Sequence, residues 1–179
     1  EVIREDGPQA HYKKQGTPTM GGIILLIAII IPTLLWAKLD DRYIMIILSA
    51  TLWMGFIGFI DDYLKVIKKY PKGLIARYKL LGQLAAGLLV ALSLYYFPES
   101  AQIRTVTSIP FISNGIIDLG LFYIPLIILV ILGTSNAVNL TDGLDGLATG
   151  LVAISTLVFG AIAYATGRYD FSNYLNILY

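Results

Sequence analysis

The sequence predicts an all-α polytopic membrane protein, and three observations lead to this class. Hydrophobic residues make up 56% of the 179 residues, charged residues only 14%, and the mean hydropathy is +0.72. Ordinary soluble domains carry about 25% charged residues. Five apolar runs follow one another along the chain, and none alternates between apolar and polar residues as a barrel strand would. Five such runs in a short chain also argue against the buried helices of a soluble protein.

Each apolar run has roughly the length that a membrane-spanning helix needs, which is about 20 residues for a hydrocarbon core of about 30 Å. The first run contains Pro32, the second carries no charge, and the third is interrupted only by Gln83 and Ser93. The fourth run has the shortest apolar core. The predicted spans, all within one integral membrane domain that covers 1–179, are 20–37, 43–60, 80–97, 119–134 and 147–166.

The distribution of basic residues predicts the orientation of these spans. Five spans place the segments 1–19, 61–79 and 133–146 on one side of the membrane, and nine of the thirteen Lys and Arg residues lie there. Short loops rich in Lys and Arg stay in the cytoplasm. We therefore expect these three segments to be cytoplasmic.

The outer segment at 98–118 has a pattern of its own. Thr105, Val106 and Thr107 favour a strand, Ser113-Asn114-Gly115 is a turn signal, and Ile116-Ile117 follows it. The sequence thus predicts a small extracytoplasmic β-hairpin near 105–118.

Composition also excludes several classes of function. The 13 basic residues are balanced by 12 acidic ones, so the chain lacks the positive charge of a nucleic-acid-binding domain. The absence of cysteine excludes disulfide scaffolds and thiolate metal sites, and a single histidine excludes a histidine-rich zinc centre.

Two acidic residues, Asp61 and Asp62, directly follow the second apolar run on the predicted cytoplasmic side. Two interpretations stay open. Carboxylates at the end of a span can simply mark the membrane interface, where the cost of a charge is lower than at the bilayer centre. Adjacent carboxylates can also hold a divalent cation or act as a general base. Their position on the basic side favours the second interpretation.

Asn and Asp residues recur every third position in the third cytoplasmic segment. Neighbours at this spacing share a face of an α-helix. Their side-chain oxygens are the ligands that Mg²⁺ uses together with phosphate oxygens and water. Turn and capping roles are the alternative interpretation. The four residues are Asn136, Asn139, Asp142 and Asp145.

The lysines between the second and third spans suit contact with anionic lipid headgroups. This group consists of Lys65, Lys68, Lys69 and Lys72. Arg77 and Lys79 differ because they lie where the third span re-enters the membrane, next to the predicted site. A cation there could neutralise a pyrophosphate.

Three segments, at 6–22, 58–65 and 136–148, closely resemble the cytoplasmic motifs of bacterial phospho-N-acetylmuramoyl-pentapeptide transferases. These enzymes belong to a superfamily that transfers N-acetylhexosamine 1-phosphates to polyprenyl phosphates. The Gly-Thr-Pro-Thr-Met-Gly-Gly stretch at 16–22 and the Thr-Asp-Gly-Leu-Asp-Gly stretch at 141–146 favour the muramoyl-pentapeptide branch over the branch that uses UDP-N-acetylglucosamine.

The resemblance implies transfer of phospho-MurNAc-pentapeptide from UDP-MurNAc-pentapeptide to undecaprenyl phosphate, with lipid I and UMP as products. It implies a Mg²⁺ cofactor and a multi-pass protein of the bacterial inner membrane with its active site on the cytoplasmic face. A homodimer is an expected assembly. The alternatives are a transferase that uses UDP-N-acetylglucosamine and, from a different class, an ion-coupled transporter with intramembrane carboxylates.

The resemblance also implies roles for individual residues. Asp61 and Asp62 lie near the acceptor phosphate, with Asp61 as the general base. Asn139 and Asp142 lie near the metal and the diphosphate, and Asp142 counts among the catalytic residues. Substrate contacts are expected from Lys14, Thr19, Lys79, Asn136 and Asp145, with Arg77 as the competitor for the role of Lys79.

The family carries further spans, another catalytic Asp and a histidine-rich motif that this sequence lacks. We therefore expect the 179 residues to be an internal segment of a longer protein and to be inactive alone.

Overall fold

The computed structural model describes residues 20–70, 73–98, 100–101, 104–108, 116–142 and 146–175. The chain forms two compact units, Glu1–Leu132 and Gly133–Tyr179. The single domain over 1–179 stays a prediction.

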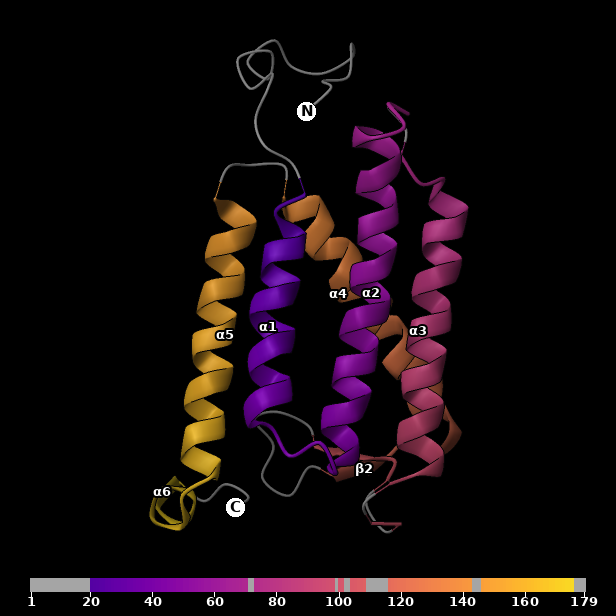
Figure 1. Cartoon of the computed structure of the whole chain (residues 1–179). Coiled ribbons are helices and arrows are strands. Elements are labelled where there is room, and N and C mark those ends of the chain that lie inside the picture. The colour runs from indigo at the N-terminus through magenta and orange to yellow at the C-terminus, as the bar shows by residue number, and fades with distance from the viewer. Residues whose placement is uncertain are drawn as a thin grey trace. The chain divides into compact units, whose positions relative to one another are not determined.

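The first unit contains three long helices, α1 (Gly22–Trp36), α2 (Arg42–Val66) and α3 (Ala76–Tyr96). Helix α2 packs against both α1 and α3, so it is the central helix of the three (Figure 1). In the described residues, four helices are long and apolar enough to cross a membrane, and α1 is a shorter apolar helix. The predicted class of an all-α polytopic membrane protein is confirmed.

Helix α2 is longer than the predicted span. It continues past the predicted span of 43–60, through Asp61 and Asp62 to Val66. The extension has a local cause: Asp61 and Lys65 stand four residues apart, with the acid on the N-terminal side, and such a pair stabilises a helix. The two carboxylates therefore lie on a helix and not in the loop that the hydropathy pattern predicts.

Helix α4 (Tyr123–Thr141) follows the short 3₁₀ turn η2 (Gly120–Phe122) and also exceeds its predicted span of 119–134. Pro125 lies in its first turn, where a missing backbone N–H removes no helical hydrogen bond. Helix α5 (Leu147–Thr166) coincides with the predicted span. A short helix, α6 (Tyr169–Leu175), follows α5 and contacts it. The hydropathy pattern does not predict this helix.

Small residues let the helices of the first unit approach closely, as is common in membrane helix packing. A methyl group added at Gly87 of α3 would lie 3.2 Å from the Cα atom of Ile128 in α4. One added at Gly55 of α2 would lie 2.7 Å from a methyl carbon of Leu26 in α1. The indole N–H of Trp53 adds a hydrogen bond of 3.0 Å to the Gly82 carbonyl and so joins α2 to α3.

The predicted hairpin is confirmed in its strands. β1 (Val106–Ser108) and β2 (Ile116–Asp118) pair antiparallel, with Val106 opposite Asp118. The turn predicted at 113–115 lies outside the described residues. The hydroxyl of Thr105 and the amide of Gly120 both donate to the Asp118 carboxylate. These two hydrogen bonds lower the pKa of Asp118 below its usual 3.8, and the bond from the Thr105 hydroxyl has the larger effect.

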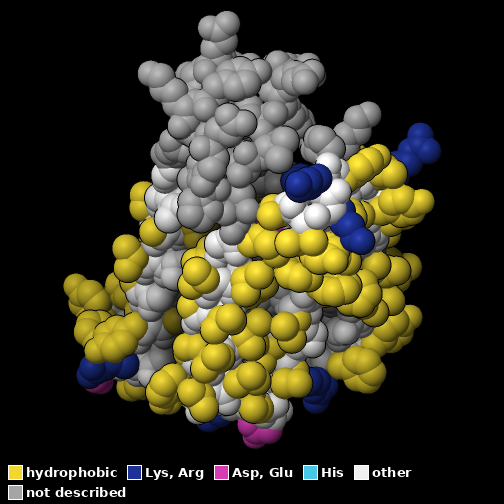
Figure 2. All heavy atoms as spheres, turned by 45° about the horizontal axis from the view of Figure 1, so that its top comes forward, with side chains coloured by type: hydrophobic (Ala, Val, Ile, Leu, Met, Phe, Trp, Pro, Cys, Tyr) yellow, Lys and Arg dark blue, Asp and Glu magenta, His cyan; other side chains and the backbone are white. Residues whose placement is uncertain are grey.

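The outer surface of the helices is apolar. On the face that Figure 2 shows, hydrophobic side chains cover most of the described surface, and charged side chains lie toward its upper and lower edges. Large residues such as Ile24, Trp36 and Phe159 are 72–80% exposed. Soluble monomers rarely expose contiguous apolar patches beyond a few hundred Å². Together with the length of the helices, this surface identifies a multi-pass membrane protein.

Candidate functional site

The carboxylate of Asp61 lies in a dense polar cluster at the C-terminal end of α2. Its Oδ2 atom is 2.6 Å from the Lys65 ammonium and 4.0 Å from the Lys79 ammonium. Its Oδ1 atom accepts the backbone N–H of Leu74 at 2.8 Å. Only 8% of the residue is exposed. Both oxygens are thus engaged by donors, which satisfies a buried charge.

The loop between α2 and α3 supplies the backbone donor of this cluster. Lys68 and Tyr70 donate backbone hydrogen bonds to the carbonyls of Tyr63 and Leu64, and Gly73 donates one to Tyr70. The loop therefore folds back over the last turn of α2. Gly73 adopts a left-handed conformation with φ at +60°, which is unfavourable for other residues.

Asp62 faces a different direction from its neighbour. Consecutive residues are about 100° apart around a helix, so the two carboxylates do not converge on one point. Asp62 is half-buried, and within the described part of the chain its carboxylate accepts no hydrogen bond. Asp61 is held by the protein, whereas Asp62 keeps its hydrogen-bonding capacity for another group.

The structure distinguishes between the two cations at the start of α3. Lys79 is partly buried and its ammonium points at Asp61, with 23% of the side chain exposed. Arg77 is exposed and forms no ion pair among the described residues. The geometry therefore favours Lys79 over Arg77 as the cation next to the predicted site.

The second group of predicted residues lies at the end of α4. Asn136 and Asn139 are on the helix, and Asp142 directly follows its last residue, with its amide 3.2 Å from the Val138 carbonyl. Asn136 and Asn139 are three residues apart and therefore neighbours on the helix surface. Asn139 and Asp142 are exposed, while Asn136 is half-buried.

The donor chemistry of this second group fits Mg²⁺. The metal usually takes one or two carboxylates with substrate phosphates and water, and seldom a full cage of protein ligands. The described residues contain no group of three or more His, Cys, Asp or Glu side chains that could form such a cage. One carboxylate, Asp142, with the amide oxygen of Asn139 would be a small donor set of the kind that Mg²⁺ takes together with phosphates and water.

Three predicted site residues, Lys14, Thr19 and Asp145, lie outside the described residues. Conversely, the structure places three residues at the cluster that sequence reasoning did not assign to it. The sequence pattern groups Lys65 with the lysines that suit lipid headgroups, and it does not single out Gly73 or Leu74. The i, i+4 spacing of Asp61 and Lys65 and the glycine in a short loop were the available signals.

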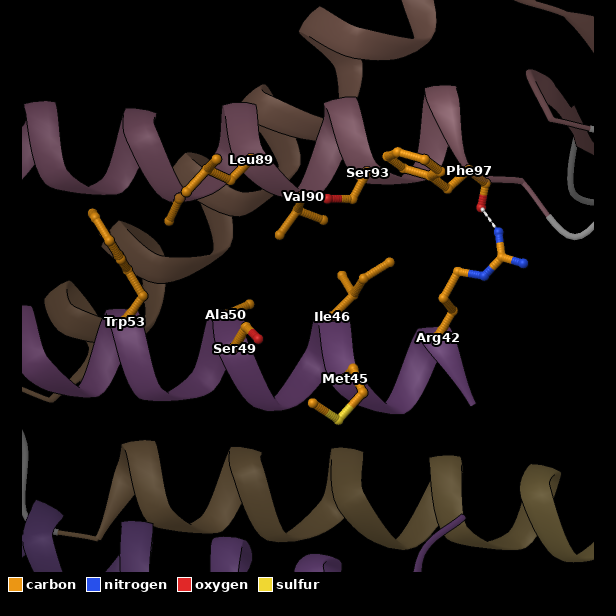
Figure 3. Close-up of a pocket in the computed structure, with 11 residues that line it drawn as sticks. Arg42, Met45, Ile46, Ser49, Ala50, Trp53, Leu89, Val90, Ser93 and Phe97 are labelled. Carbon is orange, nitrogen blue, oxygen red and sulfur yellow. Dashed lines mark hydrogen bonds between the residues drawn. The ribbon is translucent and has the colours of Figure 1, made fainter. Parts of the chain in front are cut away.

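An apolar cavity of about 270 Å³ lies elsewhere in the first unit, between the N-terminal half of α2 and the C-terminal half of α3. Figure 3 shows Trp53, Leu89 and Val90 along it, with Arg42 at one end donating to the Phe97 carbonyl at 3.3 Å. Asp61 lies toward the other end of α2. The walls are mainly apolar and hold none of the predicted site carboxylates.

Comparison with known proteins gives matches to two family models. Residues 44–179 match the family model described as glycosyl transferase family 4. Residues 14–26 match the signature described as phospho-N-acetylmuramoyl-pentapeptide-transferase signature 1. The first match contains α2 except its first two residues, and all of α3 to α6; the second contains Lys14 and Thr19, so together they include every predicted site residue.

Several curated relatives are similar over almost the whole chain. Proteins named phospho-N-acetylmuramoyl-pentapeptide-transferase are 51% identical in Thermodesulfovibrio yellowstonii, 49% in Chlorobaculum parvum and 44% in Endomicrobium trichonymphae, each over 99% of this chain. The alignments cover 48–49% of the relatives, so the chain spans about half the length of the curated relatives it matches. The resemblance predicted from the motifs is confirmed. On the match over 44–179, this chain belongs to glycosyl transferase family 4.

Proposed function

We propose that the protein containing this chain transfers phospho-MurNAc-pentapeptide from UDP-MurNAc-pentapeptide to undecaprenyl phosphate. An oxygen of the acceptor phosphate attacks the phosphorus that carries the sugar. The bond from that phosphorus to the bridging oxygen breaks, and UMP leaves with this oxygen. The product is lipid I.

The observation that carries the proposal is the Asp61 cluster. It combines a carboxylate, the ammonium groups of Lys65 and Lys79, and the carboxylate of Asp62 at one end of two membrane-length helices. Phosphoryl transfer needs positioning and neutralisation of charge more than covalent chemistry from the protein. A polar cluster at the end of a membrane helix can receive a lipid phosphate from the bilayer and a nucleotide from water. The relatives named for this reaction make it the preferred member of the class.

The charged residues of the Asp61 cluster each have a part in this scheme. Asp61 takes the proton from the acceptor phosphate as that oxygen attacks. To do so it exchanges one of its internal contacts for the substrate, and Lys65 or Lys79 then faces the phosphate charge. Asp62 orients the acceptor through its own charge.

The remaining roles concern the end of α4 and the segment before α1. Asn139 and Asp142 would hold Mg²⁺, which when bound supplies charge neutralisation at the diphosphate. Asn136 and Asp145 contact the donor, Asp145 toward its uridine end. Lys14, Thr19 and Lys79 contact phosphate groups or substrate. A homodimer stays a prediction.

The location of the active site, on the cytoplasmic face of the bacterial inner membrane, is part of the proposal. The first of its tests is chemical labelling. Cysteines introduced at Lys69 and at Thr107, both exposed, should react from opposite sides of the membrane, with position 69 accessible from the cytoplasm. A membrane-impermeant thiol reagent on intact cells and on inverted vesicles measures this. The chain has no native cysteine to interfere, and labelling of both positions from one side would contradict the topology.

The direct test is transfer of radiolabel into the lipid phase by the full-length protein. We expect label to move from UDP-MurNAc-pentapeptide to undecaprenyl phosphate and UMP to appear in equal amount. UDP-N-acetylglucosamine should neither donate nor compete strongly. Preferential use of UDP-N-acetylglucosamine would assign the protein to the other branch. Ion flux in vesicles without any transfer would assign it to a transporter.

A further inference from the structure

A backbone hydrogen bond at the Asp61 cluster is used by none of the proposed catalytic roles. The amide of Leu74, thirteen residues further along the chain, donates to Asp61 Oδ1 at 2.8 Å. This amide belongs to the loop between α2 and α3, and the carboxylate belongs to α2. A single hydrogen bond therefore connects the position of the loop to the orientation of the carboxylate.

The loop can lie this close to Asp61 because residue 73 has no side chain. A Cβ atom built at Gly73 would lie 2.5 Å from Asp61 Oδ1 and 2.5 Å from the Cε atom of Lys65. Real Cβ atoms do not approach other atoms so closely, and the carboxylate oxygen is held by its own hydrogen bond. Gly73 is also buried and has its φ at +60°, a conformation that favours glycine.

We propose that Gly73 is a positioning residue for Asp61: its bare, left-handed backbone brings the Leu74 amide onto Oδ1 and leaves Oδ2 directed toward Lys65 and Lys79. The carboxylate is thereby held in one orientation before substrate arrives. The consequence for turnover rests on the proposed function, in which Asp61 receives the proton. The hydrogen bond itself is a property of the chain and can be tested without any substrate.

Two further contacts show that the loop is anchored on α2 and does not merely touch it. The Tyr70 amide donates to the Leu64 carbonyl, and the Gly73 amide donates to the Tyr70 carbonyl, both at 2.9 Å. These bonds bring the backbone at 73–74 against the helix turn that carries Asp61. Because misplacement of a reacting group by about 1 Å can cost on the order of 10²-fold in rate, this arrangement bears on catalysis.

The chain offers a matched control for a substitution at Gly73. Gly120 also has a positive φ, at +50°, and its amide also donates to a carboxylate, that of Asp118. A Cβ atom at Gly120 would meet nothing within 4 Å. Gly120→Ala therefore reproduces the backbone strain of Gly73→Ala without the crowding of a carboxylate.

In the full-length protein, Gly73→Ala should lower kcat about 10- to 100-fold while KM for UDP-MurNAc-pentapeptide stays within about twofold. Gly120→Ala should leave both constants within about twofold of the wild type. Amide hydrogen exchange at Leu74, read by NMR in detergent micelles, should accelerate at least about tenfold in Asp61→Ala and in Gly73→Ala. It should be unchanged in Gly120→Ala.

Each outcome decides between positioning and a purely structural role. Equal losses of kcat in Gly73→Ala and Gly120→Ala would overturn the proposal, and so would wild-type exchange of the Leu74 amide in Asp61→Ala. If Gly73→Ala does not fold, the exchange measurement on Asp61→Ala still decides whether the bond exists. If the wild-type protein transfers no phospho-MurNAc-pentapeptide, the proposed function fails, while the exchange result continues to test the positioning of Asp61.

Discussion

Replacement of Asp61 by Asn in the full-length protein should lower turnover by about 10²–10⁴-fold, the usual contribution of a general base. Asn keeps an oxygen that can accept the Leu74 amide, so the loop retains its anchor on α2. It loses the charge that faces Lys65 and Lys79 and the capacity to take a proton. The substitution therefore separates proton transfer from the structural role of the same side chain.

The pH dependence of turnover distinguishes Asp61 from its neighbour. A base must be ionised to act, so its titration produces the acid limb of the pH–rate profile. We expect this limb to flatten in Asp61→Asn and to persist in Asp62→Asn, which should lose activity through charge at the acceptor. Binding of UDP-MurNAc-pentapeptide should change little in Asp61→Asn, because the proposed donor contacts lie mainly at 136–145. Near-normal turnover of Asp61→Asn with an unchanged profile would show that Asp61 only anchors the loop.

Replacement of Asp142 by Asn should lower turnover at least about 10- to 100-fold and raise the Mg²⁺ concentration needed for half-maximal activity. Changes even in residues that only support metal ligands cost that much in affinity or activity, and a direct ligand should cost no less. Turnover measured against Mg²⁺ concentration in the full-length protein tests this. An effect on turnover at all Mg²⁺ concentrations, without a shift of the half-maximal point, would contradict a ligand role.

Asp41→Asn is the matched control for this substitution. Asp41 caps the N-terminus of α2, where its carboxylate accepts the Tyr43 amide at 2.8 Å. Asn is an equally good capping residue, so Asp41→Asn should leave the helix and the activity nearly intact. Loss of activity in both variants would show that the assay reports general damage to the protein.

The membrane spans were accessible from the sequence because the signal is strong and local. About twenty apolar residues in a row have a large free energy of transfer into hydrocarbon, and no distant contact is needed to make them helical. The helix Leu147–Thr166 therefore coincides with the predicted span of 147–166. The strands at 106–108 and 116–118 were predicted for a similar reason, since β-branched residues on both sides of a turn signal pair locally.

Helices α2 and α4 extend past their predicted spans, because hydropathy reports where apolar residues stop and not where a helix stops. Asp61 and Asp62 end the apolar run of α2, yet the ion pair between Asp61 and Lys65 carries the helix on to Val66. At α4, Asn136 and Asn139 are polar but remain on the helix, which ends at Thr141. A polar residue at the membrane interface can stay helical because water or a neighbouring charge satisfies its side chain.

The sequence by itself determined the class of the protein, the order of its membrane helices and the residue types of its polar sites, because each depends on transfer free energy and on spacing along the chain. Only the tertiary structure decided which groups meet Asp61. Lys65, Lys79 and the Leu74 amide converge on one carboxylate, whereas Arg77, only two residues from Lys79, is exposed and forms no ion pair among the described residues. That choice depends on the rotation of α3 against α2 and on the left-handed turn at Gly73, and both follow from packing between residues that are distant in the sequence.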